Sequence, residues 1–207
     1  QYTTSELPNN AKEVTQIQEI VGGKSYLENQ ATKENFIAES GQSGILHLAT
    51  HTELNQVNPM FNQMWFSSAN KTQSLTAAEV YNLNIPAHLA VLSSCNTGFG
   101  KLEKSEGLMS MSRSFTYAGV SSTLMSMWKV PDKETSEIMV SFYKYLSLGK
   151  PKDEALQFAK LEYLEKQDDE VLRHPYYWAG FIVSGNVEAL PTNQNITIYF
   201  IFGVLLL

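Results

Sequence analysis

The chain has 207 residues, of which 43% are hydrophobic and 17% charged, enough for one domain with a full core. Its 10 Phe, 10 Tyr and 3 Trp exclude a disordered chain, because disordered segments lack the large apolar side chains that offset chain entropy. Fifteen basic against 21 acidic side chains give a formal net charge of -6, which excludes a field that attracts nucleic-acid phosphates. The single cysteine excludes an internal disulfide and favours a reducing, cytoplasmic setting.

The first half of the chain alternates helical and strand patterns. Apolar residues recur at helical spacing in 10–21, and a shorter helix is predicted over 32–39 with its first residue as N-cap. Two mostly apolar runs of strand length, 44–50 and 88–94, predict strands that are covered on both faces. The residues between these runs are rich in Asn, Gln and Ser. They predict an irregular or hairpin insertion that contains a strand at 64–66.

The second half continues the same alternation. A helix with apolar residues from 108 to 115 is followed by a strand over 120–128. Asp132 can N-cap the next helix, which Gly149 ends, and a further helix lies near 155–163 before a last strand at 179–184. Strands separated by helices of this length predict βαβ units with right-handed crossovers. The fold class is therefore α/β, with a mainly parallel sheet between helical layers.

Two reactive side chains follow predicted strands. Ligands of open parallel sheets bind beyond the carboxyl ends of the strands. His51 follows the strand that ends at Thr50, and Cys95 follows the strand that ends at Ser94. If these strands are neighbours, the imidazole can take the proton of the thiol and create a thiolate nucleophile. The alternative, which the strand pattern alone leaves open, is a buried cysteine that only packs.

A metal or nucleotide cofactor is not expected. His47 and His51 stand four residues apart, but on a strand this separation spans roughly 13 Å, too far for both to hold one ion. The sequence has no Cys-x-x-Cys pair, no glycine-rich phosphate loop and no Gly-x-Ser-x-Gly elbow. We therefore predict neither a metal site nor a bound cofactor.

Five segments resemble a known family in their order and spacing. They are His-Leu-Ala-Thr-His at 47–51, Leu-Ser-Ser-Cys-Asn-Thr-Gly at 92–98, Glu-Gly-Leu at 106–108, Met-Trp-Lys-Val-Pro-Asp at 127–132 and His-Pro-Tyr-Tyr-Trp-Ala-Gly-Phe at 174–181. Together they are similar to the CHAT domain, a caspase- and separase-like cysteine peptidase domain of bacteria that is often attached to tetratricopeptide repeats. The resemblance implies a caspase-like three-layer α/β/α fold around a central, mostly parallel sheet.

The resemblance also implies roles for individual residues. By motif position His51 is the catalytic histidine, Cys95 is the nucleophile and His47 is structural. In caspase-like enzymes a glycine follows the catalytic histidine, and its N–H forms the oxyanion hole with the N–H of the nucleophile. Here that position is Thr52. A backbone donor remains, but a β-branched residue does not readily take a positive φ, so Thr52 is the departure that bears most on activity.

Three further residues are candidates for substrate binding. The segment ending at Asp132 resembles the separase pattern in which the aspartate binds a basic P1 side chain, and the N-cap role of Asp132 is an equal alternative. Ser93 stands where metacaspases have an aspartate, and Glu106 belongs to the Glu-Gly motif of the family. We expect both to line the substrate pocket, with helix capping as the alternative for Glu106. The aromatic residues 176–178 are interpreted as packing.

The function that the resemblance implies is a cysteine endopeptidase with a Cys-His dyad, acting on a protein substrate in a regulated bacterial signalling or defence pathway. A gasdermin-like protein is one substrate that this resemblance suggests. The alternative is a catalytically weak or inactive CHAT module that serves as a scaffold or regulatory domain. No nucleic acid is expected as a partner.

The expected domain organisation has three parts. Residues 1–190 form the peptidase domain, which lacks the early strands of complete CHAT domains and any regulatory repeats upstream. A polar linker follows at 191–195. The uncharged run 196–207 is predicted to begin a transmembrane helix that anchors the domain on the cytoplasmic face of a membrane. A final core strand is the alternative, because Ile, Thr, Tyr and Phe favour sheets.

Overall fold

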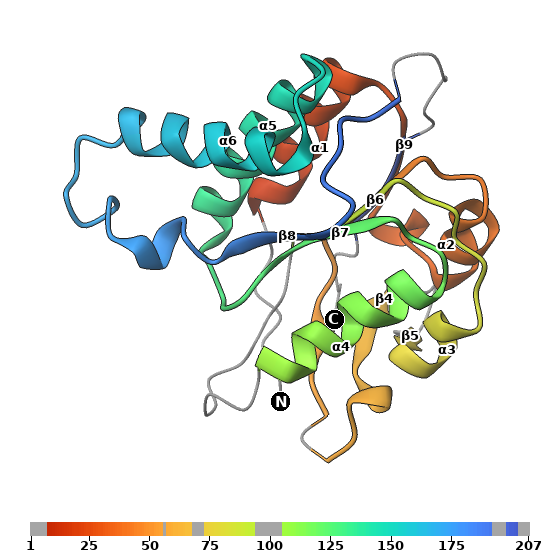
Figure 1. Cartoon of the computed structure of the whole chain (residues 1–207). Coiled ribbons are helices and arrows are strands. Elements are labelled where there is room, and N and C mark those ends of the chain that lie inside the picture. The colour runs from red at the N-terminus through yellow and green to blue at the C-terminus, as the bar shows by residue number, and fades with distance from the viewer. Residues whose placement is uncertain (1–7, 56, 68–72, 94–104, 192–197, 203–207) are drawn as a thin grey trace.

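The computed structural model describes residues 8–55, 57–67, 73–93, 105–191 and 198–202, with only the backbone described for 8–11, 105–110 and 199–202. Its centre is a six-stranded sheet in the order β1-β9-β2-β6-β7-β8 (Figure 1). The strands are β1 (Lys24–Leu27), β9 (Ile198–Phe202), β2 (Ile45–Leu48), β6 (Leu89–Leu92), β7 (Ser122–Ser126) and β8 (Phe181–Gly185). All neighbouring pairs are parallel except β7 and β8. The predicted mostly parallel sheet is confirmed.

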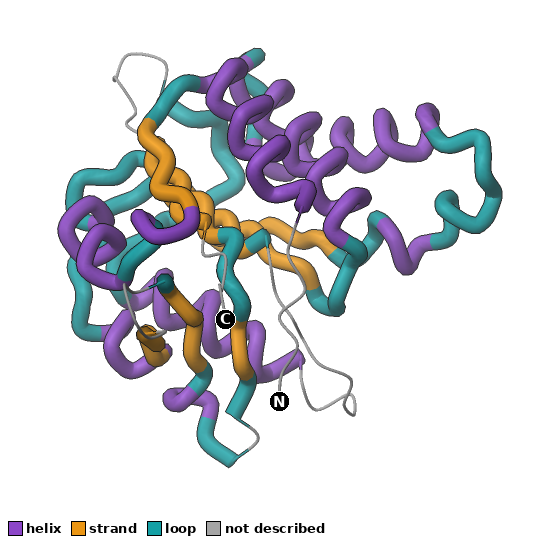
Figure 2. The backbone as a smooth tube through the Cα atoms, turned by 180° about the vertical axis from the view of Figure 1, so that it is seen from behind, coloured by secondary structure: helices purple, strands orange, loops and turns teal. Residues whose placement is uncertain are grey.

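Helical layers cover both faces of this sheet, as Figure 2 also shows from behind. One layer contains α1 (Pro8–Val21), α5 (Asp132–Ser147) and α6 (Lys152–Lys166). The other contains α2 (Lys33–Ser40), α3 (Ala77–Tyr81), α4 (Ser105–Tyr117) and a small antiparallel sheet of β3 (Thr52–Glu53), β4 (Gln63–Phe66) and β5 (Gln73–Thr76). Short 3-10 helices lie at Glu28–Gln30 (η1), Pro59–Phe61 (η2) and Pro175–Tyr177 (η4). The fold is the expected three-layer α/β/α arrangement.

Successive side chains of β2 point to opposite faces of the sheet, and each face has its own hydrophobic core. Leu46 and Leu48 pack with α2, α3 and α4, whereas Ile45 belongs to the core under α1, α5 and α6. All four residues of β2 are buried, which explains why the strand reads as a continuous apolar run interrupted only by His47. His47 alternates onto the side of Ile45 and therefore faces α1 and α5.

The C-terminal run corrects one prediction. Ile198–Phe202 forms strand β9, which pairs in parallel with β1 on one side and with β2 on the other. The side chain of Ile198 is 4% exposed and belongs to the core under α1 and α5. The transmembrane helix predicted from 196 is therefore wrong over these residues, and the core-strand alternative is confirmed. The sheet-forming domain extends beyond residue 190, while linker residues 192–195 lie outside the described part.

Within the described residues, no helix combines the length and the apolar character needed to span a bilayer.

Candidate active site

Three parallel strands end at one edge of the sheet, and the candidate residues follow them in the sequence. In the register of the sheet Leu48 of β2 lies opposite Leu92 of β6, which lies opposite Met125 of β7. His51 and Cys95 follow the paired residues Leu48 and Leu92 by the same number of positions. The strands that carry the histidine and the cysteine are thus neighbours, as the dyad requires. Cys95 itself lies outside the described residues, so its role stays a prediction.

His51 is half-buried between β2 and β3. Its carbonyl oxygen accepts a hydrogen bond of 2.9 Å from the Trp65 N–H of β4, which fixes the backbone. Burial lowers the pKa of the imidazole below its ordinary value of 6.5; Asp132 raises it and Lys129 lowers it further. A lowered pKa leaves the ring neutral near pH 7, the state in which it can accept a proton.

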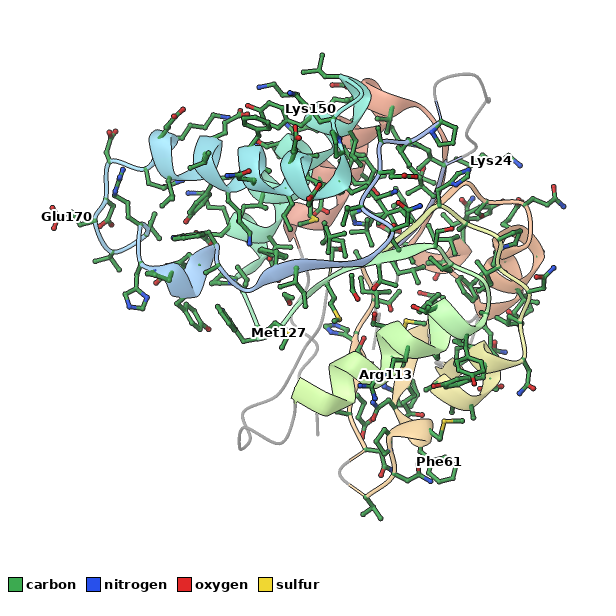
Figure 3. The ribbon with its side chains drawn as sticks, viewed as in Figure 1. Lys24, Phe61, Arg113, Met127, Lys150 and Glu170 are labelled. Atoms are coloured by element: carbon green, nitrogen blue, oxygen red, sulfur yellow. The ribbon has the colours of Figure 1, made fainter. Side chains whose placement is uncertain are left out.

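Asp132 and Lys129 reach this edge from the segment that follows β7. Met127, labelled in Figure 3, marks where β7 gives way to that segment. Burial raises the pKa of the Asp132 carboxyl, and the positive charges of Lys129 and His51 oppose the rise. Asp132, Lys129 and His51 therefore lie within electrostatic reach of one another.

The capping role predicted for Asp132 is wrong. Pro131 occupies the N-cap of α5 without a side-chain capping bond, and Asp132 is the first helical residue. Proline suits this boundary because it has no N–H and fixed φ, and an acidic residue in the first turn is favoured by the helix dipole. The Asp132 carboxylate is thus not used as the N-cap, and its substrate-binding role stays a prediction.

Thr52 adopts ordinary extended backbone at the start of β3. Glu28 is the only non-glycine residue with positive φ in the described chain, so the strain expected at Thr52 does not arise. Because Trp65 N–H bonds to the His51 carbonyl, Thr52 and Met64 form a non-hydrogen-bonded antiparallel pair. The N–H of Thr52 consequently points away from β4, at the outer edge of the small sheet. This direction is compatible with an oxyanion donor.

His47 is structural, as expected, and it holds Ser93. The imidazole is fully buried, with Nδ1 3.0 Å from the Tyr143 hydroxyl and Nε2 2.9 Å from Ser93 Oγ. The Glu13 carboxylate lies 3.1 Å from the same Nε2. Ser93, predicted to line a substrate pocket, is 6% exposed and uses its hydroxyl within this buried cluster.

The remaining candidates are only partly described. Glu106 lies in the first turn of α4, and its side chain is outside the described part. The aromatic segment of η4 is tied to the loop after β7, because Trp128 Nε1 donates to the Tyr176 carbonyl at 2.7 Å. Trp178 Nε1 donates to the Arg173 carbonyl at 3.0 Å. These bonds are in keeping with a packing role for the segment.

The described residues contain no group of three or more His, Cys, Asp and Glu side chains that could hold a metal ion.

Three residues that contact or electrostatically influence the two histidines were not identified from the sequence. Lys129 lies in the same 127–132 motif as Asp132. Its positive charge is the sequence feature that could have marked it as an influence on the pKa of His51. Glu13 and Tyr143 meet His47 from α1 and α5, far from it in the chain. No local pattern marks such tertiary contacts.

A mostly parallel sheet between helical layers, with a histidine at the carboxyl end of one strand beside the strand that leads to a cysteine, is the arrangement of caspase-like α/β domains. The sequence matches the CHAT domain family over residues 1–186, and the chain belongs to this family, a family of caspase-like cysteine peptidases.

The chain is also similar to two curated vertebrate proteins. It is 26% identical over 214 aligned residues to Tetratricopeptide repeat protein 28 of Homo sapiens and 25% identical to Tetratricopeptide repeat protein 28 of Mus musculus. Each alignment covers 87% of this chain but only 8% of the human protein and 9% of the mouse protein. The chain therefore spans a small part of the length of these relatives.

Proposed function

We propose that the chain is a cysteine endopeptidase in which Cys95 is the nucleophile and His51 the general base. The observation that carries the proposal is the register of β2 and β6, which puts the segments leading to His51 and Cys95 side by side. The lowered pKa of His51 supports it, because a neutral imidazole is needed to accept the thiol proton. Membership of a caspase-like peptidase family supports it independently.

The reaction proceeds in two stages. His51 takes the thiol proton, and the sulfur of Cys95 bonds to the substrate carbonyl carbon while the carbonyl oxygen becomes an oxyanion. Backbone N–H groups of Thr52 and Cys95 stabilise that charge. The imidazolium then protonates the leaving amine as the C–N bond breaks, which leaves a thioester. Water, deprotonated by His51, attacks the thioester, and the thiol is restored as the acid product departs.

Asp132 gives the proposed enzyme a preference for a basic P1 residue. Its carboxylate lies within electrostatic reach of His51 and is not used as the N-cap of α5. A guanidinium or ammonium group there would pair with the half-buried carboxylate. Protein substrates with Arg or Lys at the cleavage site are therefore the proposed class.

The test is covalent labelling with a peptidyl electrophile that carries Arg at P1, read by intact mass. The chain has one cysteine, so any thiol adduct reports on Cys95. We expect the native chain to be labelled and His51→Ala to be labelled at least about 100-fold more slowly. His88→Ala is the matched control, since His88 stands just before β6, at the opposite end of the strand. Equal labelling of native chain and His51→Ala would overturn the proposal and favour a CHAT scaffold without activity.

A further inference from the structure

A buried polar cluster lies beneath the candidate active site and takes no part in the reaction described above. It joins Glu13 of α1, His47 of β2, Ser93 directly after β6 and Tyr143 of α5. All four side chains are less than one-tenth exposed. Burying so many polar groups costs stability unless each finds a partner, so the cluster requires an explanation beyond packing.

The contacts of His47 fix its orientation from both sides of the ring. The Glu13 carboxylate at Nε2 favours the tautomer with the proton on that nitrogen, which leaves Nδ1 to accept from the Tyr143 hydroxyl. The Tyr143 ring also contacts the imidazole, tilted by 31° with ring centroids 5.5 Å apart. Burial, with the nearby charge of Glu13, raises the pKa of Tyr143 well above its ordinary value, so its hydroxyl stays protonated and able to donate.

Ser93 is the point where this cluster meets the peptidase chemistry. Its N–H donates to the Leu48 carbonyl at 3.1 Å, which extends the pairing of β2 and β6 by one residue. Its Oγ lies 2.9 Å from His47 Nε2, so both the backbone and the side chain of Ser93 are held by β2. Cys95 stands two positions further along the chain. The cluster therefore anchors the last described residue before the segment that contains Cys95.

We propose that His47 is a positioning residue for Cys95: oriented by Tyr143 and Glu13, it anchors Ser93 and thereby sets the reactivity of the thiol. The cluster does not touch substrate or the reacting atoms. The inference deepens the proposed peptidase function, and its predicted effect on peptide turnover rests on that function. Its predicted effect on thiol reactivity does not, because that reactivity can be measured without any substrate. It also assigns α1 a part in the site through Glu13.

The experiment measures the rate of alkylation of Cys95 by iodoacetamide between pH 6 and 10 in the whole chain. If the thiol is held beside His51, it should react at pH values below about 8.5, the ordinary pKa of a free cysteine. Ser93→Ala and Tyr143→Phe should move the midpoint of the alkylation profile toward 8.5. They should also lower kcat at least about tenfold while KM for a peptide changes less than about twofold.

Matched variants separate positioning from loss of stability. Ser112→Ala removes another buried serine hydroxyl, which lies on α4 in the other helical layer and bonds Thr123 of β7. Tyr163→Phe removes another tyrosine hydroxyl, which bonds the Leu172 carbonyl. These controls should lose comparable stability in urea but keep the alkylation profile. Ser93→Thr keeps the hydroxyl and should restore the profile that Ser93→Ala loses.

The outcomes distinguish the two proposals. If Ser93→Ala and Tyr143→Phe keep the native alkylation profile while His51→Ala changes it, the positioning inference fails and the peptidase proposal stands. If the native chain turns over no peptide but the alkylation profile still depends on Ser93 and Tyr143, the peptidase proposal fails and the inference stands. If the midpoint of the alkylation profile shifted as far in Ser112→Ala as in Ser93→Ala, the inference would be overturned, because a general loss of stability would then explain both shifts.

Discussion

The imidazole of His51 lies within electrostatic reach of the Asp132 carboxylate, although the first follows β2 and the second begins α5. Burial dominates the pKa of each group and favours the neutral form of both. Lys129 lies close to the pair and acts in the opposite direction to Asp132 on the histidine. The protonation state of His51 is thus set by burial and adjusted by two charges of opposite sign.

The directions of these influences on the pKa of His51 predict how activity falls as the solution becomes acidic. If His51 is the base, kcat/KM rises with pH through its pKa, and the midpoint should lie below 6.5. Lys129→Gln removes a cation, so the pKa of His51 and the midpoint should rise. Asp132→Asn removes an anion, so both should fall. Lys133→Gln, which removes an exposed cation paired with Glu137, should leave the midpoint unchanged. Shifts of the opposite sign in Lys129→Gln or Asp132→Asn would contradict this arrangement.

A second prediction concerns substrate choice. Asp132→Asn keeps the size of the side chain but removes the charge that a basic P1 residue would pair with. Cleavage of fluorogenic peptides after Arg or Lys should fall by roughly 10- to 100-fold in kcat/KM, while the free energy of unfolding changes little. A native enzyme that cleaves equally well after Leu and Arg would remove the specificity role from Asp132.

The larger elements of the fold are predictable because each carries a local pattern. Helices α1, α5 and α6 have repeated apolar positions, and α2 is preceded by its N-cap Thr32, whose side chain accepts from the Asn35 N–H at 3.1 Å. The buried strands β2 and β6 are recognised as apolar runs. Elements β1, β3, β5 and α3 have only 4, 2, 4 and 5 residues, and unlike the equally short β2 and β6 they contain no continuous apolar run.

The C-terminal strand β9 could not be predicted from the sequence for a different reason. An uncharged run of Ile, Thr, Tyr and Phe suits the start of a membrane helix and a buried strand alike, so composition cannot decide between them. The deciding fact is pairing with β1 and β2, which stand early in the sequence. In the same way, motif position indicated His51, whereas the effects of Lys129 and Asp132 on its pKa depend on tertiary contacts.

The place of β9 in the sheet leads to a stability prediction. Ending the chain at residue 191 would remove the strand that separates β1 from β2, so β1 would lose the strand it pairs with and β2 would pair with β6 alone. We expect loss of cooperative unfolding in urea for this chain. Ile198→Asp should also unfold or severely destabilise the domain, whereas the conservative Ile198→Val should cost about 0.5–1.5 kcal/mol. A chain ending at 191 with native cooperative unfolding would show that β9 is not needed.

The last prediction tests an ion-pair network between α5 and α6. Glu162 lies 3.0 Å from Lys144 Nζ and 2.6 Å from Lys166 Nζ. Burial raises the pKa of Glu162, but hydrogen bonds from Lys166, Lys144 and Tyr145 outweigh it and hold the pKa at about 2. Both lysines are well exposed, so solvent screening reduces the stabilisation to about 1 kcal/mol.

Because the folded-state pKa lies below the ordinary value of 4.5, this stabilisation is complete above pH 4.5 and is lost as pH falls toward 2. Urea unfolding of Glu162→Gln should therefore give a deficit of about 1 kcal/mol at pH 7 that persists at pH 5.5 and shrinks below pH 4.5. Glu154→Gln is the matched control on the same helix, since its pair with Lys150 is longer, at 3.6 Å, and exposed on both sides. A deficit in Glu162→Gln no larger than in Glu154→Gln, or one that grows as pH falls, would contradict the network's contribution.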